Sequence, residues 1–122
     1  MQSKVDVGAV LIQLKPNRKN ELKAWQQELN ARKSEAIETL KAEGVLVESW
    51  FYLQIEGKDF LMAFMRAENI KKAQQIARNS TFAIDAVHRA FKQNWEKVYP
   101  AELLLDLDNS QNENNQEAAL DL

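Results

Sequence analysis

The residue of this chain best suited to proton transfer is His88, its single histidine. Apolar residues surround it at the three- and four-residue spacing of a helix, so His88 is predicted to face the core or its edge. Imidazole titrates near neutral pH and could serve as a general acid, a general base or a ligand. The competing interpretation is structural: a neutral histidine satisfied by a carbonyl or carboxylate, which is common at partly buried positions.

A charged interruption in a long apolar helix stripe supplies the second candidate. Between Leu29 and Ala36, the stripe offers Arg32 and Lys33 where an apolar side chain is expected. Charge at such a position is costly unless it is paired or hydrated. Arg32 could therefore clamp an anionic or carbonyl substrate. Alternatively, both aliphatic stems lie along apolar surface while the charged heads reach water.

Three further side chains complete the predicted binding set. Trp50 and Tyr52 share one face of a predicted strand with Glu48, where they could line a pocket or a dimer seam. Arg66 follows an apolar strand and could pair with an acid or stand at a pocket mouth. Asp85 is predicted to stabilise the start of its helix. We predict a substrate pocket between sheet and helices, edged by Arg32, Trp50, Tyr52, Arg66 and His88.

Other chemistries find little support in the sequence. The chain has no cysteine and one histidine, which argues against thiolate catalysis, disulfides and a closed zinc site. It also lacks a glycine-rich phosphate loop, a serine elbow and an acidic metal constellation. We therefore expect neither a metal nor a cofactor, with haem binding through His88 as a minor alternative.

Charge and hydropathy narrow the possible partners. Sixteen basic and eighteen acidic residues give a net charge of −2, so no global field attracts nucleic acid. The apolar runs fall far short of the roughly 20 residues that span a bilayer, and the N-terminus lacks a signal-peptide pattern. We expect a cytoplasmic protein that binds neither nucleic acid nor membrane.

The apolar patterns predict six elements in one domain, residues 1–108. They are a strand at 5–14, a helix at 18–43, strands at 45–55 and 60–67, a helical region in two pieces at 69–78 and about 83–98, and a last strand at 102–107. Gly44 is expected to end the long helix in a left-handed conformation. Residues 109–122, rich in Asn, Gln and Glu, are predicted to form a flexible polar tail.

The order strand, helix, strand, strand, helix, strand is the β-α-β-β-α-β arrangement of a ferredoxin-like α+β domain. Right-handed crossovers then favour an antiparallel four-stranded sheet in the order 4-1-3-2, with its helices on one face. The first and third strands are apolar on both sides. Because one helix layer cannot cover both, we predict a homodimer through the open sheet face.

Several segments together resemble a family of short, uncharacterised bacterial proteins. They are LNARKSEAIETLKAEGVLVESW at 29–50, FMRAENIKKA at 64–73, IDAVHRAFKQNWEKV at 84–98 and ELLLDLD at 102–108. That family is a domain of unknown function within the dimeric α/β-barrel superfamily. The resemblance spans about residues 4–108, implies the fold and the dimer, and assigns no site residue.

Two functions remain open at this point. The first is a homodimeric protein that binds a small organic molecule. As an enzyme, it would be a cofactor-free isomerase, mutarotase or monooxygenase, with His88 moving the proton and Arg32 holding negative charge. The alternative is a non-catalytic dimeric interaction or stress-related module whose tail, ending in EAALDL, meets a partner.

Overall fold

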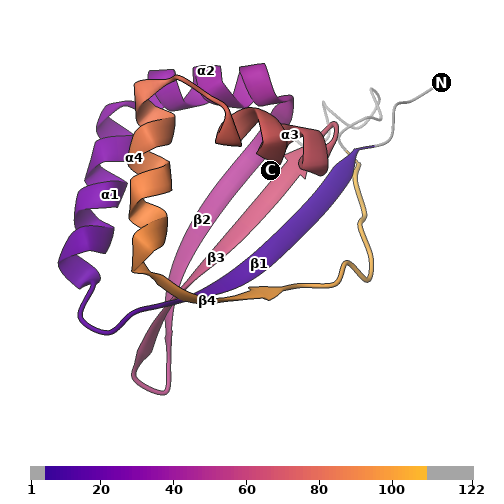
Figure 1. The fold of residues 1–122 in the computed structure, drawn as a ribbon. Helices are drawn as coiled ribbons and strands as arrows, with labels where there is room; N and C mark the ends of the chain where they lie inside the picture. The colour runs from indigo at the N-terminus through magenta and orange to yellow at the C-terminus, as the bar shows by residue number, and fades with distance from the viewer. Residues whose placement is uncertain (1–4, 110–122) are drawn as a thin grey trace, which may run out of the picture.

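The computed structural model describes residues 5–109, which form a sheet with helices packed against one side (Figure 1). The predicted tail lies outside the described residues apart from Asn109. In chain order, the elements are β1 (Asp6–Leu14), α1 (Lys19–Ala31), α2 (Lys33–Glu43), β2 (Val45–Ile55), β3 (Lys58–Ala67), α3 (Ile70–Arg78), α4 (Ala83–Phe91), a 3₁₀ turn η1 (Lys92–Asn94) and β4 (Trp95–Pro100).

The sheet has the order β2-β3-β1-β4, and every neighbouring pair is antiparallel. This confirms the predicted α+β ferredoxin-like fold and its central strands, β1 and β3. The β2–β3 hairpin turns through Glu56 and Gly57, which both have positive φ (51° and 77°). Such a turn follows the right-handed twist of the two strands.

A bulge at the start of β2 decides which side chains face the helices. Val45 is paired with Ala67 and is buried under the helices, whereas Val47 is paired with Arg66, one residue earlier on β3. Leu46 is the extra residue between them, and it reverses the alternation of the strand that follows. Beyond the bulge, the even-numbered residues of β2 therefore point toward the helices.

The hydrophobic core fills the space between the sheet and the helices. One cluster joins Ile12, Leu14 and Leu61 from the sheet to Trp25 on α1 and Phe91 on α4. A second, smaller cluster lies under α3 and contains Val45, Ala67 and Ala73. Burying a large apolar side chain contributes on the order of 2 kcal/mol, so these contacts fix the helices on this face.

The predicted long helix is interrupted, which corrects the expectation of one helix over residues 18–43. Arg32 leaves helical geometry (φ −115°, ψ 36°) and separates α1 from α2. The same residue interrupts the apolar stripe in the sequence, and its charge is neutralised by acidic neighbours on both helices. Gly44 ends α2 with φ 74°, the left-handed conformation predicted for it.

The last strand lies earlier in the chain than predicted. The helix expected to reach residue 98 ends at Phe91, and the strand expected at 102–107 is instead Trp95–Pro100. Trp95 and Val98 fit a helical spacing, but Trp, Val and Tyr also favour strands, and pairing with β1 decides between the two. Residues 101–109 form neither helix nor strand.

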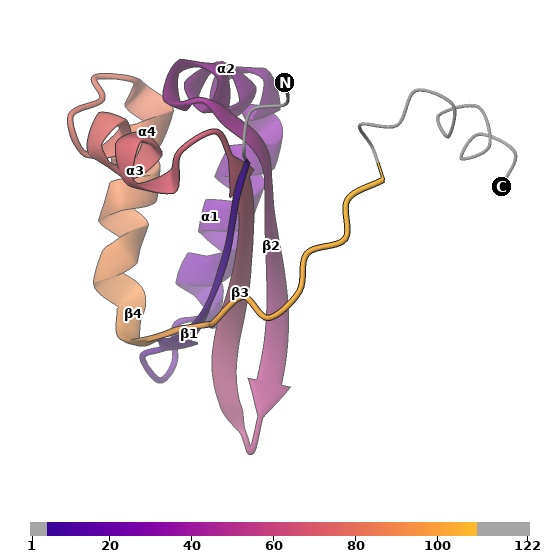
Figure 2. The same cartoon turned by 90° about the vertical axis from the view of Figure 1, so that its right-hand side faces the viewer.

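The side of the sheet away from the helices, here called the open face, is apolar. Figure 2 shows the sheet nearly edge-on, with the helices on one side only. Large apolar side chains exposed on the open face are Val47, Phe51, Ile55, Met62 and Tyr99. Among the described residues, no helix is both long and apolar enough to cross a membrane.

Candidate functional site

His88 lies on the side of α4 that faces the sheet, inside a group of aromatic rings. Its ring centroid is 5.9 Å from that of Trp25, 5.3 Å from Trp50 and 6.5 Å from Trp95. The indole Nε1 of Trp25 donates a hydrogen bond to His88 Nδ1 at 3.3 Å. Because Nδ1 accepts this bond, the neutral imidazole carries its hydrogen on Nε2.

This surrounding keeps His88 uncharged. Burial, together with the positive charges of Lys92 and Arg89, lowers the pKa of His88 to about 4. At neutral pH the imidazole can donate a hydrogen bond from Nε2, but it does not act as a cation. Burial and ring contacts are also what a purely structural histidine would have. The polar groups around His88 therefore determine whether it can take part in a reaction.

Glu48 is a carboxyl group two residues from Trp50 on the helix-facing side of β2. Trp50 Nε1 donates a hydrogen bond to Glu48 Oε2 at 2.9 Å. Burial raises the pKa of Glu48, and the charge of Asp85 raises it further. The bond from Trp50 and the charge of Lys92 oppose this rise. Glu48 therefore binds a proton more readily than an ordinary glutamate.

Two more carboxyl groups, those of Glu43 and Asp85, interact electrostatically with Glu48. Burial, together with the charges of Asp85 and Glu48, raises the pKa of Glu43 to about 7. The Oδ2 atom of Asp85 is buried and has no hydrogen-bond partner among the described residues. Carboxylates held this close in an apolar surrounding disfavour simultaneous ionisation. Within this acidic cluster of Glu43, Glu48 and Asp85, Glu43 can therefore hold and release a proton near neutral pH.

The positive charge of Lys92 lowers the pKa of both Glu48 and His88. Its Nζ lies 5.4 Å from the centre of the Trp95 ring. The buried Nε1 of Trp95 has no hydrogen-bond partner within residues 5–109. The site thus combines a proton acceptor, a neutral imidazole donor and a nearby positive charge.

The structure brings two of the five predicted site residues together, Trp50 and His88, and places the other three elsewhere. Tyr52 is exposed farther along β2, where its hydroxyl donates to Asp59 Oδ1 at 2.5 Å. Arg66 lies on the open face and pairs with Asp106 and Asp108. The fold therefore does not bring all five residues to the edge of one pocket.

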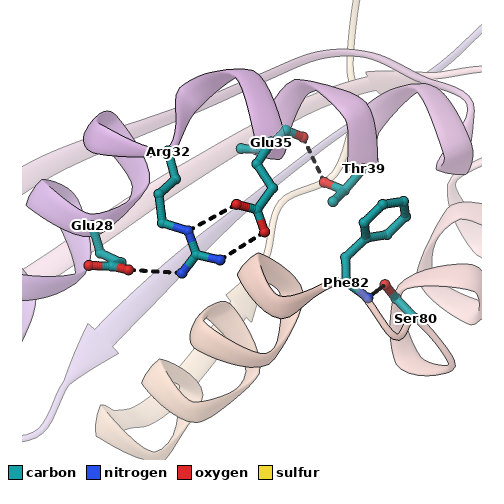
Figure 3. Close-up of polar contacts among 7 residues, drawn as sticks. Glu28, Arg32, Glu35, Thr39, Ser80 and Phe82 are labelled. Carbon is teal, nitrogen blue, oxygen red and sulfur yellow. Dashed lines mark hydrogen bonds and ion pairs between the residues drawn. The ribbon is translucent and has the colours of Figure 1, made fainter.

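Arg32 has a different setting from the predicted substrate clamp. Its guanidinium lies between the carboxylates of Glu28 and Glu35, each at 2.8 Å (Figure 3). Glu35 also accepts a hydrogen bond from the backbone of Ile84 at the start of α4. Arg32 and Glu35 thus link the helix break to the N-terminus of the helix that carries His88.

A shallow cleft of about 500 Å³ lies along α3 and the turn before α4. In that turn, the backbone N–H of Phe82 donates to Ser80 Oγ at 3.1 Å (Figure 3). The lining of the cleft contains none of the five predicted site residues. It consists of Lys72, Gln75, Ile76, Asn79, Ser80, Thr81 and Phe82.

The acidic cluster was not identified from the sequence. Lys92 and Trp95 were also not identified as neighbours of His88. One signal was available: Asp85, His88 and Lys92 follow the spacing i, i+3, i+7, which is one face of a helix. Trp95 was assigned to a helix rather than to β4. No group of three or more His, Asp or Glu in the described part of the chain is arranged to hold a metal ion.

Comparisons with known proteins support the fold and leave the activity open. A family model described as "Family of unknown function (DUF6176)" matches residues 5–112. A comparison with curated proteins finds no match.

Three solved structures share the fold at low sequence identity. A protein from an uncultured marine organism, described as a dimeric ferredoxin-like protein, has a TM-score of 0.58 and 11% identity, covering 89% of this chain and 95% of that one. A conserved protein from Methanosarcina mazei Go1 has a TM-score of 0.53 and 17% identity, with 84% and 95% covered. Rv0793 from Mycobacterium tuberculosis has a TM-score of 0.54 and 15% identity, with 86% and 100% covered.

Proposed function

The chain belongs to DUF6176, a family of unknown function, and from this starting point we propose that it is a cytoplasmic homodimer that binds a small carbonyl compound beside His88 and moves a proton on it. The cytoplasmic setting is supported by a composition without cysteine. The observation that carries the chemical part is the neutral His88 in ring contact with Trp50, whose indole N–H donates to Glu48, a carboxyl group with a raised pKa.

Each polar group has a definite task in such a reaction. In its ionised form, Glu48 removes a proton from the carbon next to the carbonyl, and the same carboxyl group returns a proton to complete an isomerisation or epimerisation. Negative charge that develops on the carbonyl oxygen is stabilised by a hydrogen bond from His88 Nε2 and by the charge of Lys92. The reaction is balanced by one proton that leaves carbon and returns to it.

The pKa values favour this division of roles. A base works best when its pKa is near the working pH, and burial moves Glu48 toward that range. A neutral imidazole is a suitable hydrogen-bond donor to a developing enolate, because it does not lose its proton outright. The rings packed around His88, those of Trp25, Trp50 and Trp95, shield it from water.

The homodimer is supported by the open face. Exposed Phe51 and Met62 lie on neighbouring strands of this face and pair in register. An apolar surface spread over several strands is unusual for a monomer, and a second sheet packed face to face would cover it. The marine ferredoxin-like protein of similar fold is itself described as dimeric.

Deuterium exchange tests the proposed proton transfer without knowledge of the natural substrate. The protein is incubated in D₂O with small ketones, hydroxyketones, lactones and keto acids, and exchange at the carbon next to the carbonyl is followed by NMR. For at least one compound, Glu48→Gln should slow the catalysed exchange at least about 100-fold, because glutamine keeps the hydrogen bond from Trp50 but cannot take up a proton.

Tyr52→Phe provides the matched control on the same strand face. It removes a hydroxyl bonded to Asp59, away from His88, and should leave exchange unchanged. Full activity of Glu48→Gln would contradict the role of this carboxyl group. If the wild-type protein exchanges no compound and the indole N–H signals of its tryptophans do not shift, the non-catalytic dimeric interaction module becomes the better function.

A further inference from the structure

The segment that follows β4, residues 101–109, displays a row of apolar side chains. Its four leucines are exposed to 55%, 86%, 71% and 82% at Leu103, Leu104, Leu105 and Leu107. Leucines are seldom gathered in this way on a surface without a partner. A partner surface is therefore expected to cover these leucines.

The course of this segment is held at two places. At its start, the backbone N–H of Ala101 donates to the carbonyl oxygen of Ala9 at 3.0 Å. Farther along, the two terminal nitrogens of Arg66 donate to Asp106 Oδ1 at 2.8 Å and to Asp108 Oδ2 at 2.6 Å. These paired carboxylates and the guanidinium are mostly shielded, with side-chain exposures of 30%, 24% and 19%. A segment held this way presents its leucines in a defined position.

The segment also lies on a particular side of the molecule. Figure 2 shows it standing away from the sheet on the side opposite the helices. Arg66, which holds it, points out of β3 on the open face, because its neighbours Met65 and Ala67 pack in the core beneath the helices. The leucines are thus displayed beside the surface on which we propose that a second sheet packs.

We propose that residues 101–109 form a dimer arm, which reaches past its own sheet and packs its leucines on the second copy of the chain. The inference rests on the homodimer of the proposed function. Two sheets packed face to face lie about 10 Å apart, so a segment standing off the open face of one copy runs along the other. The two-fold symmetry of such a dimer gives each copy one arm and one surface to receive it.

Arg66 positions the arm in this arrangement. Its ion pairs neutralise Asp106 and Asp108, which flank Leu107, so these acids do not carry unpaired charge toward an apolar contact. A second copy is favoured over an unrelated partner because the arm and the exposed residues of the open face, such as Phe51 and Met62, form neighbouring apolar surfaces on one side of the molecule.

The full-length double variant Leu104→Asp/Leu107→Asp tests the arm. Its dimer dissociation constant, measured by sedimentation and light scattering, should rise at least about 100-fold, because two charges would enter an apolar contact. The circular dichroism spectrum should stay unchanged, since both side chains are exposed in the single chain. Ile37→Asp is the control: Ile37 is an exposed apolar residue of α2, and its replacement should leave the dimer intact.

Crosslinking identifies what the arm touches. Because the natural chain has no cysteine, Leu104→Cys can be labelled at one site with a photoreactive group. Irradiation should yield a covalent dimer in high proportion. A wild-type dimer whose double variant dissociates no more readily, and whose label forms no covalent dimer, would overturn the arm while leaving the proposed homodimer in place. A wild-type protein that stays monomeric would overturn both.

Discussion

Replacing Phe51 with aspartate should convert the proposed dimer into a monomer at micromolar concentration. Phe51 is 57% exposed and lies opposite Met62 on the open face, so in the proposed dimer it is covered by the second sheet. A carboxylate there would lose its hydration without gaining a cation. We expect the dissociation constant to rise at least about 1000-fold, which is equivalent to about 4 kcal/mol.

Light scattering coupled to size exclusion measures this change directly. The monomeric variant should keep its helical circular dichroism signal, because Phe51 contributes to the open face and not to the two core clusters. Phe82→Asp is a close control, since Phe82 is also an exposed phenylalanine, 42% accessible, but lies at the start of α4. An undisturbed dimer of Phe51→Asp would rule out pairing through this face.

Acidification should destabilise the wild-type protein through His88 in a way that His88→Gln does not share. The folded pKa of about 4 lies below the ordinary value of 6.5, so the unfolded chain binds a proton that the folded chain excludes. The contribution of neutral His88 is therefore fully present above pH 6.5 and is lost as the pH falls toward 4. Between pH 7.5 and 5.0, the loss amounts to about 2 kcal/mol.

Urea denaturation of both proteins at the two pH values isolates this contribution. The stability difference between wild type and His88→Gln should shrink by about 2 kcal/mol on going to pH 5.0. Thr39→Val, which alters a buried group that does not titrate, should cost the same at both pH values. A difference between wild type and His88→Gln that does not depend on pH would mean that the imidazole is hydrated and can be protonated in the folded chain.

Glu43 changes the stability of the fold in the opposite direction over this pH range. The pKa of Glu43 is raised to about 7, so the folded chain holds a proton that the unfolded chain releases above its ordinary value of 4.5. The contribution of Glu43 is fully present below pH 4.5 and is lost as the pH rises through about 7. Differences between variants, and not the wild-type profile alone, therefore separate His88 from the carboxyl groups.

Much of the architecture could be predicted because it depends on local patterns. The apolar runs of β1 and β3 identified the two central strands, and Gly44 identified the end of α2. Arg32 and Lys33 located a break in the helix stripe, although one continuous helix was expected there. The end of α4 was misplaced because Trp95 and Val98 satisfy helical and strand spacing alike, and only pairing with β1 distinguishes them.

The candidate site was harder to predict because its properties arise from contacts between distant segments. Trp25 and His88 are 63 residues apart, yet they share the hydrogen bond that defines the imidazole tautomer. Arg66 was expected at the pocket between sheet and helices. It lies instead on the open face, where its partners come from 40 and 42 residues farther along the chain. Neither relation leaves a periodic trace in the sequence.

The bulge at Leu46 has a consequence for how this protein can change over evolution. It sets the parity of β2, so that Glu48 and Trp50 face the helices while Phe51 faces outward. Loss of that one residue would turn the strand inside out, exposing the carboxyl group and burying the phenylalanine. Substitutions can therefore alter either side of β2 separately, whereas a single-residue deletion at the bulge would disrupt the proposed chemistry and the proposed assembly in one step.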